Sequence, residues 1–95
     1  MSGSVYILTN RPNGTLYTGV TARLSERIDE HREGRGSLFT RRYGLKRLVW
    51  YEHHADIRDA IQRETSLKRW RRAWKVRLIL DMNPDWHDLY KTLAH

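Results

Sequence analysis

The 95-residue sequence contains no cysteine, which excludes disulfides, thiolate nucleophiles and cysteine-ligated zinc. It has no apolar run near the roughly 20 residues that a membrane-spanning helix needs, and its first residues do not resemble a signal peptide. No repeat, low-complexity tract or linker divides it. We therefore expect one cytoplasmic domain over residues 1–95, whose chemistry depends on oxygen and nitrogen groups.

Basic residues outnumber acidic ones. Eighteen Lys and Arg stand against eleven Asp and Glu, which gives a formal net charge of +7. This charge favours a polyanionic partner, but it does not by itself separate DNA, RNA and anionic lipid. Four Trp, five Tyr and one Phe supply large side chains for a small core, so the chain is expected to fold although 31% of its residues are charged.

Two β-branched and aromatic segments near the N-terminus, residues 5–9 and 15–20, flank an Arg-Pro-Asn-Gly sequence at 11–14. This pattern predicts a β-hairpin with a four-residue loop. Pro12 suits the second position of a type I turn, and Gly14 can adopt a positive φ.

The register of this hairpin brings candidate functional residues together. A four-residue loop places Tyr6 opposite Gly19 and Leu8 opposite Tyr17, so the tyrosines share one face as diagonal neighbours about 7 to 8 Å apart. Tyrosine is also common in strands as a packing residue alone. A glycine opposite Tyr6 leaves a gap that a ligand or a backbone segment can approach, or it marks a β-bulge.

Propensity and capping signals give the order of the remaining elements. A helix capped by Thr21 is expected to reach about residue 33, followed by a basic loop at 34–44 and a strand at 45–52. Asp56 opens a helical region that ends at about Asp81 and is expected to form two helices. A short closing helix or turn follows at 86–93. The sequence therefore predicts an α+β domain with a small three-stranded, mostly antiparallel sheet flanked by helices.

One carboxylate interrupts an apolar helix face. The apolar residues at helical spacing are Ile57, Ala60, Ile61 and Leu67. Glu64 lies within this stripe. Because burying an unpaired carboxylate costs several kcal/mol, Glu64 either pairs with Lys68 one turn later or opens onto a cleft that a cation can reach.

Arg27 and His31 are one turn apart on the first helix, so they lie along the same edge and can converge on one ligand. A guanidinium offers a planar fork of donors to phosphate oxygens, and an imidazole can relay a proton or donate to a phosphate. The alternative is a pair of helix-surface residues, with Arg27 bridging Glu30.

Cations alternate with tryptophans between Lys68 and Arg77. Trp70, Trp74 and Leu78 recur at helical spacing, and the tryptophans are expected in the core. The cations form either a solvated face or a surface that follows phosphates. The candidate nucleic-acid-binding residues are Arg35, Arg41, Arg42, Lys46, Lys68, Arg71, Arg72 and Lys75.

Taken in order, these residues resemble the GIY-YIG nuclease superfamily, specifically its small single-domain members. The two signature tripeptides match Ser4-Val5-Tyr6 and Tyr17-Thr18-Gly19. Arg27 and His31 follow where the family carries them, and Glu64 matches the family's metal-binding glutamate.

The likeness extends through residues 83–86, with two departures: Ser4-Val5 replaces Gly-Ile, and Thr18 replaces the middle Ile. The tyrosines and Gly19 are kept, and the changed positions look structural in this family. The Ser4 change is therefore expected to alter the first strand locally rather than catalysis.

The resemblance implies a metal-dependent endonuclease that hydrolyses phosphodiesters of nucleic acid, with DNA favoured over RNA. It implies that Tyr6 is the general base, as a phenolate favoured by the positive charges of Arg27 and the metal. Tyr17 would orient the water or the phosphate, and His31 would be a polar contact or proton relay. Glu64 would hold one Mg²⁺ or Mn²⁺ ion, and Gly19 and Asn83 would support the site. The candidate cations would position the backbone without reading sequence.

Two alternatives remain open at this point. One is a nucleic-acid-binding accessory module of the same fold that cuts weakly or not at all. The other is a membrane-surface or protein-interaction domain, whose affinity for nucleic acid would not show the steep salt dependence of phosphate binding. The sequence does not determine the oligomeric state.

Overall fold

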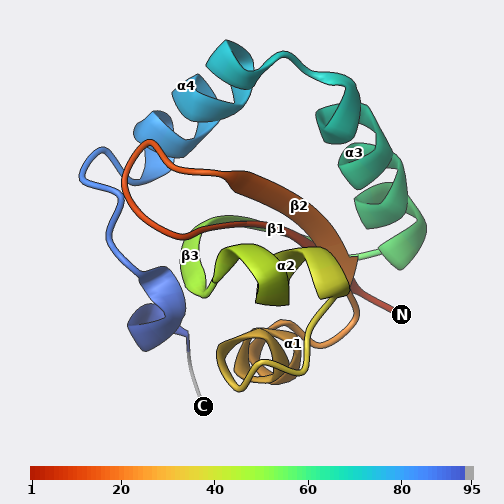
Figure 1. Ribbon diagram of the computed structural model, residues 1–95. Helices are drawn as coiled ribbons and strands as arrows, with labels where there is room; N and C mark the ends of the chain where they lie inside the picture. Colours follow the sequence, from red (N-terminus) through yellow and green to blue (C-terminus); the bar gives the residue numbers. More distant parts are fainter. Residues whose placement is uncertain (94–95) are drawn as a thin grey trace.

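The computed structural model describes residues 1–93 and consists of a small sheet with helices around it (Figure 1). The elements in chain order are β1 (Gly3–Thr9), β2 (Leu16–Thr21), α1 (Leu24–Arg32), α2 (Leu38–Tyr43), β3 (Arg47–His54), α3 (Ile57–Arg69), α4 (Arg72–Met82) and the 3₁₀ helix η1 (Leu89–Thr92). The strand order is β2-β1-β3, and both pairings are antiparallel. The predicted α+β class with a three-stranded sheet is confirmed.

The hairpin of β1 and β2 has the predicted register. Tyr6 lies opposite Gly19, and Leu8 lies opposite Tyr17. Since side chains alternate along a strand, this register places both tyrosines on the same face of the sheet. At Ser4, where the family has glycine, β1 stays paired with both neighbours, and the only register irregularity in β1 falls between Ile7 and Leu8.

The hairpin turn differs from the prediction in one detail. The Gly14 N–H donates to the carbonyl of Arg11 at 2.9 Å, but the positive φ of 59° belongs to Asn13. A positive φ at the third position is typical of a type II turn, not of type I. Gly14 is required for space instead, because a Cβ there would lie 2.0 Å from the Oδ1 atom of Asn10.

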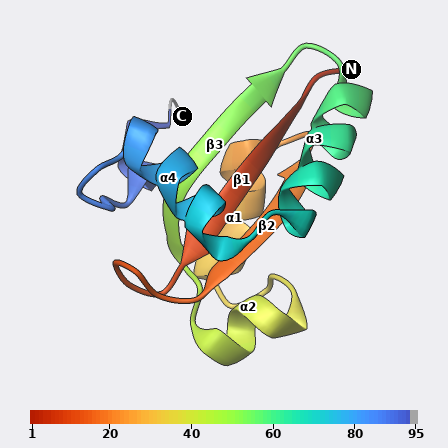
Figure 2. The same cartoon turned by 90° about the horizontal axis from the view of Figure 1, so that it is seen from above.

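The sheet has a hydrophobic cluster on each face, so β1 is buried along its whole length. Val5 and Ile7 pack with α3 and α4, whereas Tyr6 and Leu8 pack with Ile28 of α1 on the other face. In Figure 1 α4 lies above the sheet and α1 below it, and Figure 2 shows α4 in front of the strands with α1 behind them. The central strand therefore holds the functional residues of one face rigidly against α1.

The helix predicted to start at Thr21 starts at Leu24 instead. The Thr21 hydroxyl accepts the N–H of Arg23 at 3.0 Å, and Arg23 occupies the N-cap position without a capping side chain. Thr21 therefore shapes the connection before α1, because β2 continues through this residue.

The basic loop predicted at residues 34–44 contains a helix, α2, which is a correction. Ser37 caps it by accepting the N–H of Thr40 at 3.2 Å, and Gly44 ends it with a φ of 64°. Six residues are too few for a periodic pattern, so the cap residues are the only signals of α2 in the sequence.

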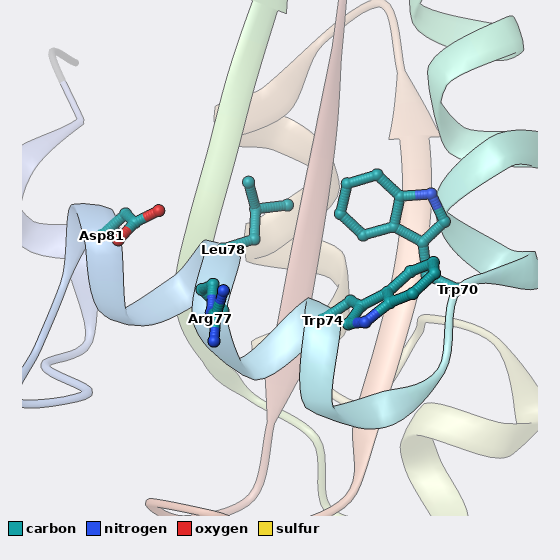
Figure 3. A pocket seen from close by; sticks show the side chains of 5 residues that line it. All are labelled: Trp70, Trp74, Arg77, Leu78 and Asp81. Atoms are coloured by element: carbon teal, nitrogen blue, oxygen red, sulfur yellow. The ribbon is translucent and has the colours of Figure 1, made fainter.

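Trp74 was predicted in the core, but 52% of it is exposed. Trp70 is the C-cap of α3 in an extended conformation, and Trp74 belongs to α4. The two residues therefore do not lie on one continuous helix, as their spacing had suggested. The two rings meet edge to face at 6.0 Å and line an open pocket with Leu78, Arg77 and Asp81 (Figure 3). Of these five pocket residues, only Trp70 and Leu78 pack against the hydrophobic cluster that contains Val5 and Ile7.

Thr18, which differs from the family's signature, is expected to lower the stability of the fold. Its hydroxyl is the one buried side-chain polar atom in residues 1–93 that has no hydrogen-bond partner. An unsatisfied buried hydroxyl costs about 1 to 3 kcal/mol. Thr18→Val is therefore expected to raise the free energy of unfolding by about 1 kcal/mol, measured by urea denaturation.

Thr9 is the matched control for this substitution. It is fully buried on β1, and its hydroxyl donates to the carbonyl of Arg11 at 3.0 Å. Thr9→Val should lower the free energy of unfolding. A decrease for Thr18→Val as well would show that its hydroxyl is satisfied.

No helix in the described part of the chain is long and apolar enough to cross a membrane.

Candidate active site

Tyr6 and His31 form a buried hydrogen-bonded pair between β1 and α1. The Tyr6 hydroxyl lies 3.1 Å from Nε2 of His31, and the two residues are only 1% and 2% exposed. On the other side of the imidazole, Nδ1 lies 3.0 Å from Oγ1 of Thr40. Thr40 belongs to α2, so two helices and the central strand meet at this histidine.

The hydrogen bonds of Thr40 determine the tautomer of His31. The Thr40 hydroxyl donates its single hydrogen to the carbonyl of Ser37 at 3.0 Å, so only a lone pair faces the imidazole. Nδ1 of His31 must therefore carry the hydrogen and donate to Thr40. Nε2 is then an acceptor, and the Tyr6 hydroxyl donates to it.

The pKa values of both residues favour this neutral pair. Burial raises the pKa of Tyr6 to about 12, although the hydrogen bond from the Arg27 guanidinium acts in the opposite direction. Burial, and then the charge of Arg27, lowers the pKa of His31 to about 4. Desolvation outweighs the positive charge of Arg27, so this charge alone does not favour the phenolate that was predicted from Arg27 and the metal together.

Tyr17 completes a group of three rings. Its ring centroid lies 6.3 Å from that of Tyr6 and 5.8 Å from that of His31. Tyr17 is partly exposed, whereas the other two rings are buried. Tyr17 is therefore the member of this group that solvent reaches.

Two glycines make room for the buried pair. A Cβ at Gly19 would lie 2.4 Å from the hydroxyl oxygen of Tyr6, and a Cβ at Gly36 would lie 2.1 Å from Nδ1 of His31. Any side chain at either position must displace a buried ring. The gap predicted opposite Tyr6 is thus filled by the Tyr6 side chain itself. Gly36 was not singled out from the sequence, because its role depends on the fold of the connection between α1 and α2.

Arg27 contacts both an acid of its own helix and Tyr6. Its guanidinium donates to Glu30 at 3.3 Å, as the surface alternative required. It also hydrogen-bonds toward Tyr6, which lowers the pKa of the phenol against the effect of burial. The Arg27 side chain is 31% exposed, so donors remain accessible to an incoming phosphate.

Glu64 lies on α3 with only 14% of its side chain exposed, and it pairs with Nζ of Lys68 at 2.9 Å. Its negative charge raises the pKa of Tyr6, so the carboxylate is within electrostatic reach of the phenol. The side chain of Lys68 is 52% exposed and has room to move into solvent. Lys68 would therefore have to give up this ion pair for Glu64 to bind a metal ion.

The donor set suits a cation that keeps most of its water. Among residues 1–93 no group of three or more His, Asp or Glu side chains could hold a metal ion. Mg²⁺ is commonly held by one or two carboxylates together with waters and substrate phosphates. The single carboxylate of Glu64, within electrostatic reach of Tyr6, fits that pattern.

The candidate nucleic-acid-binding cations fall into two sets. The exposed side chains of Arg41, Arg42, Lys46 and Arg71 have no ion-pair partner in the described residues, and Lys75 of α4 is partly exposed without one. The others are engaged inside the protein: Arg35 with Glu33 at 2.7 Å, Lys68 with Glu64, and Arg72 with the carbonyls of Asn13 and Gly14 at 2.8 and 2.7 Å. Arg72 thereby anchors the hairpin turn.

Asn83 stabilises the fold at some remove from the candidate catalytic residues. Its Nδ2 donates to the carbonyls of Val49 and His87, and its Oδ1 accepts the N–H of His87. These bonds hold the segment after α4 against β3. Asn83 therefore supports the sheet face packed with α4, since Val49 belongs to that cluster, and its support of the site stays a prediction.

Comparisons with known proteins bear on the family and the fold of this chain. A family model described as the GIY-YIG catalytic domain matches residues 2–77, the segment that contains Tyr6, Tyr17, Arg27, His31 and Glu64. A UPF0213 protein of Clostridium perfringens is 40% identical over 75 residues, which cover 79% of this chain and 80% of that protein. A UPF0213 protein of Natronomonas pharaonis is 39% identical over 77 residues, or 81% and 89% of the two chains.

A solved structure shares the architecture as well. The solution NMR structure of a UPF0213 protein from Bacillus halodurans has a TM-score of 0.59 and 29% sequence identity, with 100% of both chains covered. The family match spans most of the sequence and includes both signature tripeptides. The chain therefore belongs to the GIY-YIG family.

Proposed function

We propose that this protein is a metal-dependent endonuclease that hydrolyses phosphodiester bonds of nucleic acid, with DNA as the favoured polymer. Its family is of the nuclease type. The observation that supports the proposal most strongly is the hydrogen bond of 3.1 Å from Tyr6 to the lone pair of His31. It gives a phenol with a raised pKa a route by which its proton can leave.

The proton route begins at the attacking water. Only about one Tyr6 side chain in 10⁵ would be ionised at pH 7 with a pKa of about 12, so a standing phenolate is scarce. In the proposed reaction Tyr6 takes a proton from the water while passing its own proton to Nε2 of His31. The water oxygen bonds to phosphorus, and the bond from phosphorus to the leaving sugar oxygen breaks. The leaving oxygen takes a proton from a solvent water, and His31 returns the proton it received to solvent after the product leaves, which restores the neutral pair.

Bound phosphate would support this transfer. Its negative charge favours the protonated imidazole of His31 and offsets the charge of Arg27, which in the free protein helps to keep that pKa low. Arg27 would donate to the phosphate oxygens, and Tyr17 would orient the phosphate or the water. Glu64 would hold one Mg²⁺ or Mn²⁺ ion, which when bound neutralises charge growing on the phosphate.

A nicking assay tests the proposal. Supercoiled plasmid incubated with the protein and Mg²⁺ or Mn²⁺ should become open-circular, and excess EDTA should abolish the conversion. Affinity measured in EDTA should fall steeply as salt rises, because phosphate contacts release counterions.

Two other outcomes would replace the proposal. Salt-sensitive binding without metal-dependent nicking would indicate the accessory binding module. Absence of salt-sensitive affinity for either DNA or RNA would indicate a membrane-surface or protein-interaction domain.

A further inference from the structure

Helix α2 exposes aromatic rings beside the candidate active site. Phe39 is 43% exposed and Tyr43 is 45% exposed, and their ring centroids lie 4.8 Å apart. Single exposed apolar side chains are common on protein surfaces, whereas large ones that lie together indicate a binding surface. We call Phe39 and Tyr43 the α2 platform.

The α2 platform is continuous with the buried catalytic pair. Phe39 stacks on Tyr17 at 6.2 Å with an interplanar angle of 28°, and Tyr17 lies 6.3 Å from Tyr6. The rings of Tyr6, Tyr17, Phe39 and Tyr43 thus form an unbroken series from the interior to solvent. A planar group bound on the platform would lie directly beside the phenols that are proposed to act on the phosphate.

The charges around the α2 platform indicate which kind of ligand fits it. The guanidinium of Arg42 lies over the Tyr43 ring at 5.6 Å from its centroid, and Arg41 is exposed on the same helix. Helix α2 contains no acidic residue. An open pocket here is lined by Leu38, Phe39, Arg42 and Tyr43. Apolar rings with cations beside them suit a ligand that has both a planar apolar part and negative charge.

A nucleobase with its phosphate has these properties. Bases stack on exposed aromatic rings in single-stranded nucleic acid, and arginine contributes cation–π and phosphate contacts there. Inside a duplex the faces of each base are occupied by its neighbours, so a protein ring can stack only on a base that has left the helix. The platform therefore discriminates by strandedness and not by sequence.

We propose that the α2 platform stacks an unpaired nucleobase next to the scissile phosphate, so that the preferred substrate is single-stranded or locally unpaired nucleic acid. This inference rests on the proposed nuclease function and names its substrate class. A protein partner, including a second copy of this chain, is the competing occupant. The series of rings leading to Tyr6 and the absence of acidic residues from α2 favour the nucleic acid.

The test measures binding in EDTA, so it does not depend on cleavage. Fluorescence anisotropy would give the affinity of the full chain for a labelled single-stranded oligonucleotide, for the matched duplex and for an oligonucleotide of the same length with abasic sites. The double variant Phe39→Ala/Tyr43→Ala should bind the single strand about 10- to 100-fold more weakly than wild type. Its duplex affinity should stay within about twofold, because phosphate contacts are unchanged.

The abasic oligonucleotide separates stacking from charge, since it keeps every phosphate and lacks the bases. Wild type should lose affinity for it, and the double variant should bind it as weakly as wild type does. Tyr43→Phe keeps the ring and should bind single strands normally. Leu80→Ala, at a position 41% exposed on α4 and outside this pocket, should also leave binding unchanged.

Two results would overturn the platform proposal. One is an equal loss of affinity for duplex and single strand in the double variant, with an unchanged thermal unfolding midpoint. The other is unchanged single-strand binding together with loss of a wild-type dimer in size-exclusion chromatography, which would assign the platform to a second copy. Plasmid nicking without the single-strand preference would reject the platform alone, whereas the strand preference without nicking would reject only the nuclease.

Discussion

Replacing Tyr6 with phenylalanine is expected to slow metal-dependent plasmid nicking by about 100-fold or more, within the range that proton transfer by a positioned group contributes. The substitution keeps the buried ring and removes only the oxygen that faces Nε2 of His31 at 3.1 Å. The attacking water then has no phenol to receive its proton. Single-turnover nicking rates at saturating protein would measure the effect on the chemical step.

Tyr51 provides the control for this substitution. It lies directly opposite Tyr6 on β3 and packs in the same cluster, so Tyr51→Phe makes the same chemical change on the same face of the sheet. Its nicking rate should stay within about twofold of wild type, because no proton route passes through it. A Tyr6→Phe protein that nicks as fast as Tyr51→Phe would remove the phenol from the mechanism.

Tyr6→Phe also leaves Nε2 of His31 buried without a donor. An unpaired buried acceptor costs about 1 to 3 kcal/mol, so the free energy of unfolding should fall by that amount. The nicking assays therefore need to be run well below the thermal midpoint of the variant. A lower rate at a temperature where both proteins are folded then reports on chemistry and not on unfolding.

Glu64→Gln is expected to lower the nicking rate by about 100-fold or more at every Mg²⁺ concentration that can be tested, which is the scale of losing one electrostatic stabiliser of the transition state. Glutamine has nearly the same shape, so the partly buried position on α3 stays filled. It lacks the negative charge that would hold a divalent ion. Retention of wild-type activity would exclude Glu64 as the metal ligand.

The ion pair with Lys68 offers an opposite control. The Lys68 ammonium lies 2.9 Å from the Glu64 carboxylate and would compete with a cation for it. Lys68→Ala should lower the Mg²⁺ concentration for half-maximal nicking by up to about fivefold, because a half-exposed ion pair contributes at most about 1 kcal/mol. If Glu64 binds the ion, Glu64→Gln would thus lower nicking at every Mg²⁺ concentration, whereas Lys68→Ala would increase nicking at low Mg²⁺ concentration.

Local patterns in the sequence were sufficient to predict the hairpin and the start of the helical region after Asp56. The register of Tyr6 opposite Gly19 follows from a four-residue loop and the strand period of two, so it required no tertiary information. Asp56 caps α3 by accepting the N–H of Arg58 at 2.9 Å, as its position before an apolar stripe indicated. These features depend only on residues close in sequence.

Other predictions failed where spacing was taken as evidence of burial. Ile61 belongs to the apolar stripe of α3 but is 48% exposed, and Trp74 is 52% exposed. Periodicity shows which residues share a helix face, but not how far the neighbouring elements cover that face. Gly36 and Thr40 escaped notice for a related reason, because their contacts with His31 arise only when α2 packs beside α1.

The sequence by itself determined the family, the register of the two tyrosines and the identity of the acid that interrupts an apolar helix face. Only the tertiary structure decided the protonation of the Tyr6–His31 pair and the exposure of the α2 platform. Electrostatics in a folded protein depends on desolvation and on partners distant in the chain, and the burial of Tyr6 outweighs the nearby guanidinium of Arg27. Residue types and their spacing carry no measure of that balance.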